Sequence, residues 1–561
     1  MRHGWLRLLA ASSCLLLVGP ALAQLKGRVW THAPLGIELT IPDGFSLVPL
    51  QVDEKWIIGK FLDDKTYLSK DKDWNKEHRA LMRVIAFTEA AKKGTGVEVQ
   101  EEKDGTTFIG IGAVPYQGYQ NYVKRHRSGF FFSKEEKAKV GGQDCLMCEV
   151  QVHKSEPKLH LFSVVFRQPT FEVAVEFEVL EDRIDKMQKA CRDALESLRF
   201  TKPAAATAVT GEQKKVGGVA ASQSNRLWRA FRSEWRKRPS LERSEIRRQI
   251  EREHHAAVRS KTPADWIVID AKRFLVVSHA DERFTARMLE SAEVFYDWCE
   301  EEFGSLGDEY IRRPVLRLCR DADEYKAYHF DSSGSTGWSL FGDDHEIGTY
   351  RDDYNGTSGK DASTLFDGIL IHYLQEMDPY IVDYSPYWLT WSLDDYVTSA
   401  IVKERKLDFR VDDWVRDGSR DMQREGKLPK LRTILELDAD SFSTMQKGER
   451  RTGYATTQGL RFVLGPGQKE KVFKDFLRTY FKAVIAAAER HAAEWDSRPA
   501  GSKSAETEEE EEKQAKAQTD KSKERRKQLQ KEINAAVFQK IDDKQWEKFD
   551  KAFDAFVKAG K

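Results

Sequence analysis

Three polar residues in the second half of the chain have the types and spacing of metal ligands. His372 and Glu376 lie four positions apart, which places an imidazole nitrogen and a carboxylate oxygen on one face of a helix. Asp395 follows in a second expected helix and adds another oxygen. Such a His–Glu–Asp set would hold zinc or manganese loosely, since a catalytic zinc needs about three protein ligands and an open position. It would also lack a general base for metal-bound water.

The pair Cys145 and Cys148 forms a CxxC pattern, which in other settings binds zinc or exchanges disulfides. The surrounding residues 144–152 alternate between apolar and polar side chains, as in a β-strand. Residues three apart on a strand point to opposite faces. There is no second CxxC in the sequence, so the pattern favours two structural cysteines.

The elements expected around the polar residues form a mixed α+β pattern. His372 lies in one predicted helix, and Trp391 and Asp395 lie in the next. The periodicity predicts strands over 266–270, 273–278, 314–319 and 347–350, and helices over 280–303, 363–377, 386–403 and 471–495.

The stretches FLVVS, VLRLC, GTY, LFDGILIHYLQEM, PYWLTWSLDDYV and YATTQGLRFVL, over about residues 266–484, resemble the gluzincin (peptidase MA-like) metallopeptidase domain of exported bacterial proteins. The resemblance implies a zincin-like α+β fold with a helical C-terminal part. The family signature is HExxH on one helix and WLxEGxxEY on the next. Its two His and the first Glu of the second motif bind zinc, and the Glu of HExxH is the general base.

This chain departs from the signature at its chemical positions. HExxH is replaced by His372-Tyr373-Leu374-Gln375-Glu376, and Trp391 stands where the third ligand is expected. A phenol with a pKa near 10 is a poor base at neutral pH, and an indole does not bind zinc. The resemblance therefore indicates a pseudoenzyme without a cofactor, in which Tyr373 and Trp391 occupy vestigial positions. The alternative is an active zinc site made by His372, Glu376 and Asp395.

The resemblance also implies a substrate cleft lined by an edge strand. The candidate strand contains Ile347, Gly348, Thr349 and Tyr350, which would pair with an extended peptide. Tyr373 and Trp391 would give the floor of this cleft an aromatic lining suited to binding.

The first half of the chain has the pattern of a separate small α/β domain. Strands are expected over 35–42, 83–87, 146–152, 159–167 and 172–179, and an amphipathic helix over 182–198. This order resembles exported PsbP-like domains, which are mostly binding or accessory modules.

Composition and charge divide the chain into seven segments. The expected segments are a signal peptide at 1–23, an N-terminal α/β domain at 24–201, a linker at 202–225, a basic helical connector at 226–262, a zincin-like domain at 263–496, a charged low-complexity insertion, disordered or helical and solvated, at 497–533, and a C-terminal helix at 534–561 that packs on the zincin-like domain.

Export and ligand binding are the function that this sequence favours. A signal peptide cut after Ala23 predicts a periplasmic or extracellular protein without a transmembrane segment. Lys plus Arg equals Asp plus Glu at 91 each, so no overall field attracts nucleic acid. We expect a non-catalytic protein that binds a peptide, a protein or an envelope component. The alternatives are an active zinc-dependent peptidase and a structural assembly factor of the cell envelope; ligand and oligomeric state stay open.

Overall fold

The computed structural model describes residues 24–51, 56–70, 77–89, 116–126, 129–152, 158–201, 235–304, 306–307, 309–328, 339–340, 346–351, 360–496 and 508–560. The chain divides into two compact units. The described residues between 24 and 201 form the first unit, and those between 235 and 560 form the second. The expected signal peptide (1–23) and linker (202–225) lie outside the described residues.

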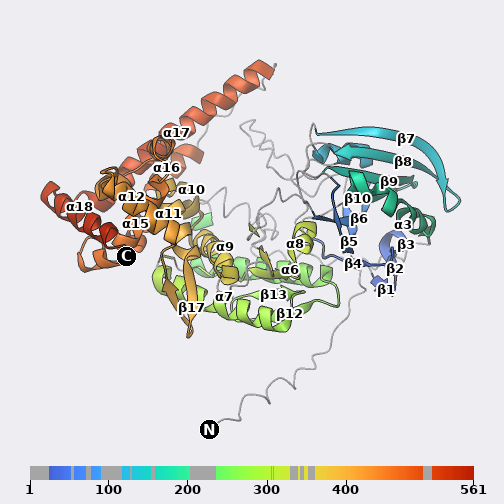
Figure 1. Cartoon of the computed structure of the whole chain (residues 1–561), viewed down its shortest axis with the longest axis horizontal. Helices are drawn as coiled ribbons and strands as arrows, with labels where there is room; N and C mark the ends of the chain where they lie inside the picture. The colour runs from blue at the N-terminus through green and yellow to red at the C-terminus, as the bar shows by residue number, and fades with distance from the viewer. Residues whose placement is uncertain are drawn as a thin grey trace, which may run out of the picture. The chain divides into compact units, whose positions relative to one another are not determined.

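The first unit is built on an antiparallel sheet of seven strands, visible in blue to green in Figure 1. Along β10, alternate residues such as Val173, Val175 and Phe177 enter the core, which is why this sequence forms a strand. The strands, in spatial order, are β4 (Phe45–Leu47), β5 (Ile57–Leu68), β6 (Glu77–Thr88), β10 (Phe171–Leu180), β9 (Leu159–Arg167), β8 (Gln143–Val152) and β7 (Phe130–Val140).

A four-stranded sheet and a helix complete the first unit. Helix α3 (Ile184–Glu196) buries Met187, Cys191 and Ala194 at helical spacing against the same core. The remaining elements are β1 (Gln24–Lys26), β2 (Val29–His32), β3 (Ile37–Thr40), β11 (Arg199–Phe200) and the short helix α2 (Tyr119–Tyr122).

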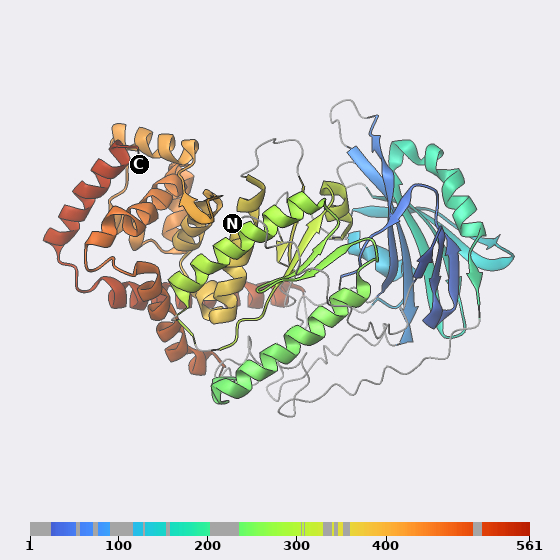
Figure 2. The ribbon, with the colours of Figure 1, turned by 90° about the horizontal axis from the view of Figure 1, so that it is seen from below.

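The second unit contains a five-stranded sheet in the order β12-β13-β14-β16-β15, with helix α7 running beside it (Figure 2). The three central strands are parallel, and both outer strands are antiparallel to their neighbours. The strands are β12 (Ile267–Asp270), β13 (Leu275–Ser278), β14 (Val315–Cys319), β16 (Glu346–Tyr350) and β15 (Ser339–Leu340).

The two faces of this sheet have different partners. Val276, Leu316 and Ile347 join a core with helices α7 (Glu282–Phe303) and α9 (Lys360–Met377). On the other face Glu346 accepts a hydrogen bond from Tyr328 of α8 (Ala322–Tyr328). Glu346 also lies 3.8 Å from His254 of α6 (Ser240–Lys261). The basic helix α6 is therefore an integral layer of the fold, and its His254 and His255 are buried or nearly so.

Helices follow the sheet in the C-terminal part (Figure 1). Between them, β17 (Ala400–Lys403) and β18 (Lys406–Phe409) form a hairpin, so the helix predicted over 386–403 was too long at its C-terminal end. The helices are α10 (Pro379–Tyr384), α11 (Tyr387–Thr398), α12 (Asp413–Arg424), α13 (Leu431–Leu435), α14 (Ala439–Gly448), α15 (Thr452–Leu464), α16 (Phe476–Asp496), α17 (Glu508–Phe538) and α18 (Asp543–Lys558).

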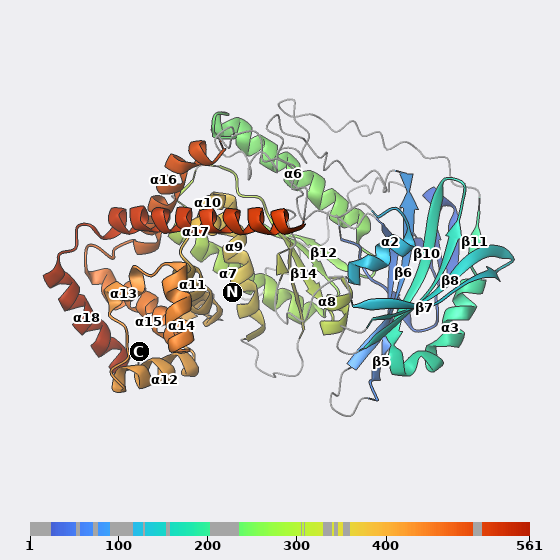
Figure 3. The same ribbon diagram turned by 90° about the horizontal axis from the view of Figure 1, so that it is seen from above.

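The charged insertion at 497–533 was predicted to be disordered or a solvated helix. The structure contradicts this prediction for the last residues of the segment, which are helical and packed. Helix α17 begins at Glu508, runs without a break to Phe538 and lies alongside α16 (Figure 3). Leu529 and Ile533 are almost fully buried in the core, because they share a helix face with Val537. The expected C-terminal helix at 534–561 is instead the end of α17 and a separate helix α18, which begins with a capping box at Asp542.

The structure confirms the mixed α+β class with a helical C-terminal part. Within the described residues, no helix has the length and apolarity needed to cross a membrane.

Candidate functional site

His372 lies fully buried near the C-terminal end of α9. Its Nε2 is 2.8 Å from the backbone oxygen of Arg312, and because a carbonyl only accepts, Nε2 carries the proton and donates it. Burial lowers the pKa of His372 to about 4, so the imidazole is neutral at physiological pH. The nitrogen that projects toward Arg312 is therefore used in a hydrogen bond within the protein.

Glu376, one turn later and also fully buried, is held by two arginines. Arg312 donates from Nη2 to Oε1 at 2.7 Å and from its backbone N–H to Oε2 at 2.9 Å. Arg247 of α6 donates from Nη2 to Oε2 at 2.9 Å. Both carboxylate oxygens thus accept charge-assisted hydrogen bonds, which are about twice as strong as neutral ones.

A second acid extends this cluster. Glu309 accepts from Arg247 at 3.2 Å and pairs with Arg243 at 2.9 Å. Trp235 donates its indole N–H to the same carboxylate at 3.0 Å. We call Arg243, Arg247, Glu309, Arg312 and Glu376 the arginine–glutamate network. It joins the connector helix α6 to α9 through Glu376.

Asp395 of α11 has a different partner from the two α9 residues. Its Oδ2 accepts a hydrogen bond from the Thr457 hydroxyl of α15 at 2.7 Å. Burial raises the pKa of Asp395 to about 6. The structure therefore brings His372 and Glu376 together on one helix, and it directs Asp395 to a neighbouring helix. In the described part of the chain, no group of three or more His, Cys, Asp and Glu side chains is arranged to hold a metal.

Tyr373 is part of the hydrophobic core. It is 1% exposed, with its ring 5.3 Å from that of Tyr296 and 6.3 Å from that of Phe303. Burial raises its pKa above the ordinary value for a phenol. The expectation that Tyr373 lines a cleft was wrong, because this face of α9 packs on α7.

Trp391 lies at a surface of aromatic side chains. Its ring is 6.0 Å from that of Tyr387 and 6.3 Å from that of Phe442. The lack of a side chain at Gly453 gives Trp391 room, since a Cβ there would lie 3.0 Å from the indole nitrogen. The next residue, Tyr454, packs edge-on against Trp414 at 5.3 Å. The aromatic surface comprises Tyr387, Trp391, Trp414 and Tyr454, of which Tyr387 is 48% and Trp414 53% exposed. The buried Phe442 packs against Tyr387 and Trp391.

Strand β16, which contains Ile347, Gly348, Thr349 and Tyr350, is not at the edge of its sheet. It pairs with β14 on one side and with β15 on the other, where Ser339 opposes Gly348 and Leu340 opposes Ile347. Ile347 and Thr349 are buried. The predicted edge strand for peptide addition was therefore misplaced, because a further short strand covers it.

Cys145 and Cys148 are both buried on β8 as free thiols. Cys145 lies in the core cluster of the first unit, and Cys148 opposes Glu135 and Ser163 across the sheet. Burial raises the pKa of Cys148 to about 12, so this thiol is not a nucleophile at neutral pH.

Sequence reasoning missed the two arginines that hold Glu376. In α6, Arg247 lies beside the buried Ile246 and Ile250, so it falls within the apolar face of a helix that reads as basic overall. That position is the signal that could have identified it, because a charge on a buried face must have a partner.

No protein-family model and no curated protein matches the chain. Solved structures give distant similarities. PsbP (CyanoP) from Synechocystis sp. PCC 6803 has 17% identity over 34% of this chain and 99% of its own, with a TM-score of 0.21. LpqN from Mycobacterium tuberculosis, described as involved in cell envelope biogenesis, has 14% identity over 30% of this chain and 83% of its own, with a TM-score of 0.19.

A third structure, from Bacteroides thetaiotaomicron, has 11% identity over 44% of this chain and 85% of its own, with a TM-score of 0.18. All of these TM-scores are 0.21 or lower. The function proposed below therefore depends on the geometry of the chain itself.

Proposed function

We propose that the second unit is a non-catalytic binding module of an exported protein, with the architecture of a degenerate gluzincin. The observation that carries this proposal is the arginine–glutamate network. A zinc ligand needs an available lone pair, and both oxygens of the Glu376 carboxylate are used by Arg247 and Arg312. Guanidinium groups at this position also repel a divalent cation.

The metal content of the protein tests this proposal directly. The mature chain, residues 24–561, is purified without chelator or metal-affinity resin and is measured beside a His372→Ala variant by elemental analysis. We expect less than about 0.1 zinc or manganese per chain in both samples. About one metal per chain, lost in the variant, would support the alternative enzyme with His372, Glu376 and Asp395, and a peptidase screen would follow.

The binding surface that the geometry favours is the aromatic surface around Trp391. Tyrosine and tryptophan are enriched at protein interfaces, where they bury apolar area while keeping a polar group. Tyr387 and Trp414 are the most exposed members of this surface. We propose that a peptide or protein, including a protein of the cell envelope, docks on these rings rather than pairing with β16.

A double variant, Tyr387→Ala with Trp414→Ala, tests the surface. Proteins captured from an envelope fraction by the wild-type chain should be recovered poorly by the double variant. Leu241→Ala is a matched control, because Leu241 is an exposed apolar side chain on α6, at 79% exposure. Equal recovery by all three proteins would exclude the aromatic surface as the docking site.

The third possibility, an assembly factor that uses its charged segment, makes a separate prediction. Since α17 carries core residues from Leu529 onward, the charged part must be altered without removing them. Replacing the five glutamates at 508–512 by glutamine leaves the buried turns intact. Loss of a partner in this variant, with recovery by the aromatic double variant unchanged, would favour the assembly role.

A further inference from the structure

The hairpin of β17 and β18 ends in four consecutive charged residues, Lys403, Glu404, Arg405 and Lys406, all of which are exposed. We call these four residues the hairpin tip. Figure 1 shows the hairpin extending away from the helices at its base. The surrounding stretch 360–496 is described without a gap. Three cations are thus presented within four residues of a projecting turn.

The strands that carry the tip are anchored at their base. Phe409 of β18 stacks on Tyr396 of α11, with the ring centroids 4.4 Å apart, and its ring is 5.2 Å from that of Trp298 of α7. Val402 and Leu407, which oppose each other in the hairpin, pack against the same core. Because these side chains hold the base, the tip keeps its direction relative to the second unit.

Two features of the tip are locally unfavourable. Glu404 and Arg405 have φ angles of 51° and 59°, in the left-handed region that residues other than glycine rarely adopt. Two-residue turns with positive φ at both positions usually contain Asn-Gly or Asp-Gly. Lys403 also lies directly opposite Lys406, and like charges at opposed positions destabilise a strand pair. The tip keeps its charges against the preferences of turn and strand pair, which is typical of functional sites.

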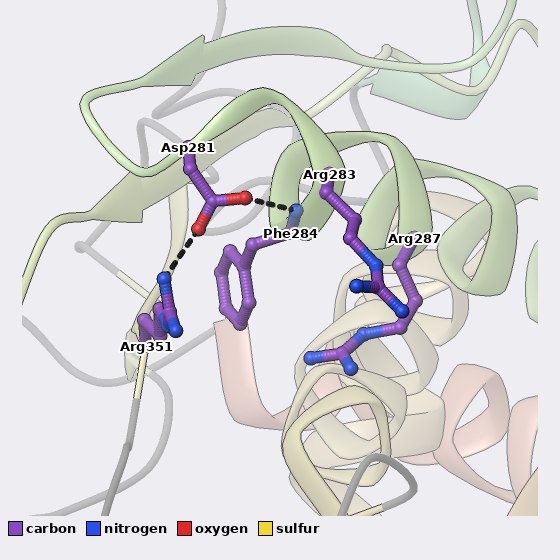
Figure 4. Close-up of a pocket in the computed structure, with 5 residues that line it drawn as sticks. All are labelled: Asp281, Arg283, Phe284, Arg287 and Arg351. Atoms are coloured by element: carbon purple, nitrogen blue, oxygen red, sulfur yellow. Dashed lines mark hydrogen bonds and ion pairs between the residues drawn. The ribbon is translucent and has the colours of Figure 1, made fainter.

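The cations of the tip are available to a partner. Within the described part of the chain, no carboxylate lies at ion-pair distance from any of the three. The arginines at the start of α7, where Arg283, Arg287 and Arg351 line a pocket, differ in this respect (Figure 4). There Arg351 donates to Asp281 at 2.6 Å, and Arg287 lies over the Phe284 ring, 5.5 Å from its centroid. Neighbouring groups of the fold therefore engage Arg287 and Arg351.

We propose that the hairpin tip contacts the phosphate groups of an anionic phospholipid bilayer. Lysine and arginine both bind phosphate. The opposed positions of Lys403 and Lys406 place both side chains on one face of the hairpin, so both ammonium groups can reach one phosphate. A projecting turn can meet several headgroups of an extended surface at once. The tip carries no apolar side chain, so the contact is electrostatic.

This contact is separate from the aromatic surface, whose rings belong to α11, α12 and α15. Sedimentation of the mature protein with phospholipid vesicles at low ionic strength tests it. Vesicles of phosphatidylcholine with phosphatidylglycerol should bind the wild-type chain more tightly than phosphatidylcholine alone, and added salt should weaken this binding. A Lys403→Gln/Arg405→Gln/Lys406→Gln variant should bind the anionic vesicles about tenfold more weakly or worse, since each cation near such a surface contributes about fivefold.

The matched control removes the same charge from another exposed segment. Lys469→Gln/Lys471→Gln/Lys474→Gln replaces three exposed lysines between α15 and α16. This variant should bind the anionic vesicles like the wild type. An equal loss of binding in both triple variants would overturn the proposal, because binding would then depend on overall charge rather than on the hairpin tip.

A single substitution tests the turn itself. Glycine adopts the left-handed region freely, so Arg405→Gly should unfold at a higher temperature than the wild type while binding the anionic vesicles about fivefold more weakly. Unchanged vesicle binding by this variant would contradict the role of Arg405. Poly-glutamate and inorganic phosphate are the further probes. Tip-dependent binding of either, without binding to anionic vesicles, would overturn the bilayer in favour of an acidic protein or a soluble phosphate.

Discussion

At position 376 the residue type determines the chemistry of this end of the helix. Glu376 supplies a buried negative charge. A buried charge needs compensation, and Arg247 and Arg312 provide it from two other segments of the chain. The result is an ion-pair cluster that links α6 to α9 and that depends on each of its members.

Replacing Glu376 by Gln should therefore destabilise the second unit strongly. The amide removes the negative charge and leaves two buried guanidinium groups without full compensation, which costs about 3–5 kcal/mol of the free energy of unfolding. Urea unfolding followed by circular dichroism measures this change. Glu245→Gln is the control, because Glu245 pairs with Arg252 at the surface, where an ion pair contributes little. A loss of less than about 1 kcal/mol in Glu376→Gln would contradict the role given to the network.

A pair of carboxyl groups, Asp367 on α9 and Asp394 on α11, makes stability depend on pH. Burial and the neighbouring Asp394 raise the pKa of Asp367 to about 8, from an ordinary value of 3.8. Between these two values the folded state holds a proton that the unfolded state releases. The free energy of unfolding therefore falls as pH rises through this window.

The variant Asp367→Asn cannot release a proton and should lose this dependence. Relative to the wild type, its stability should rise between pH 5 and pH 8.5 by roughly 1–3 kcal/mol. The measurement is thermal or urea unfolding at several pH values. Asp417→Asn, at an exposed position of α12, should track the wild type at every pH. A constant difference between Asp367→Asn and the wild type would show that Asp367 does not titrate in this window.

Among the elements, α17 shows how a charged helix can be solvated in one part and packed in another. Its last turns contribute Leu529, Ile533 and Val537 to the main core of the second unit. Gln530 on the same stretch donates to the Tyr480 hydroxyl of α16 at 2.8 Å. Acidic and basic residues dominate the composition of the helix, but a few apolar side chains at a spacing of four residues are sufficient to dock it.

Substitutions on α17 should affect stability at its packed positions and leave stability unchanged at its exposed positions. Ile533→Ala should lower the free energy of unfolding by about 2–5 kcal/mol, because it leaves a cavity in a packed core. Lys531→Ala, two residues away and exposed, should change stability by less than about 0.5 kcal/mol. Chemical denaturation measures both. Equal stability of the two variants would mean that the end of α17 is not docked in solution.

At the scale of the whole molecule, each of the two units has its own large hydrophobic core among the described residues. The first unit has its own cluster around Trp30, Phe61 and Val175, and the second has a larger one around α7, α9, α15 and α16. Units that bury separate cores usually fold separately. The basic helix α6, which reads as a connector in the sequence, is tied to the second unit by the ion pair of its buried Arg247 with Glu376.

The first unit should therefore fold without the second. The calorimetric profile of residues 24–561 should show two unfolding transitions. A chain of residues 24–201 should unfold cooperatively at the temperature of one of them. Differential scanning calorimetry of both chains measures this. A chain starting at residue 263 is the useful comparison, since it lacks α6 and should be much less stable than one starting at residue 235. If residues 24–561 unfold in a single transition and residues 24–201 alone show no transition, the division into two separately folding units would be contradicted.

The sequence by itself determined the order and type of most elements. Strands such as 159–167 and helices such as the one ending at Met377 follow from local periodicity, which the chain carries regardless of its surroundings. Only the tertiary structure decided which groups surround Glu376 and the other candidate residues. Arg247 and Arg312 are distant from Glu376 in the sequence, β15 covers β16, and Arg351 joins Arg283 and Arg287 in one pocket. Long-range pairings of this kind arise from packing, which local patterns do not encode.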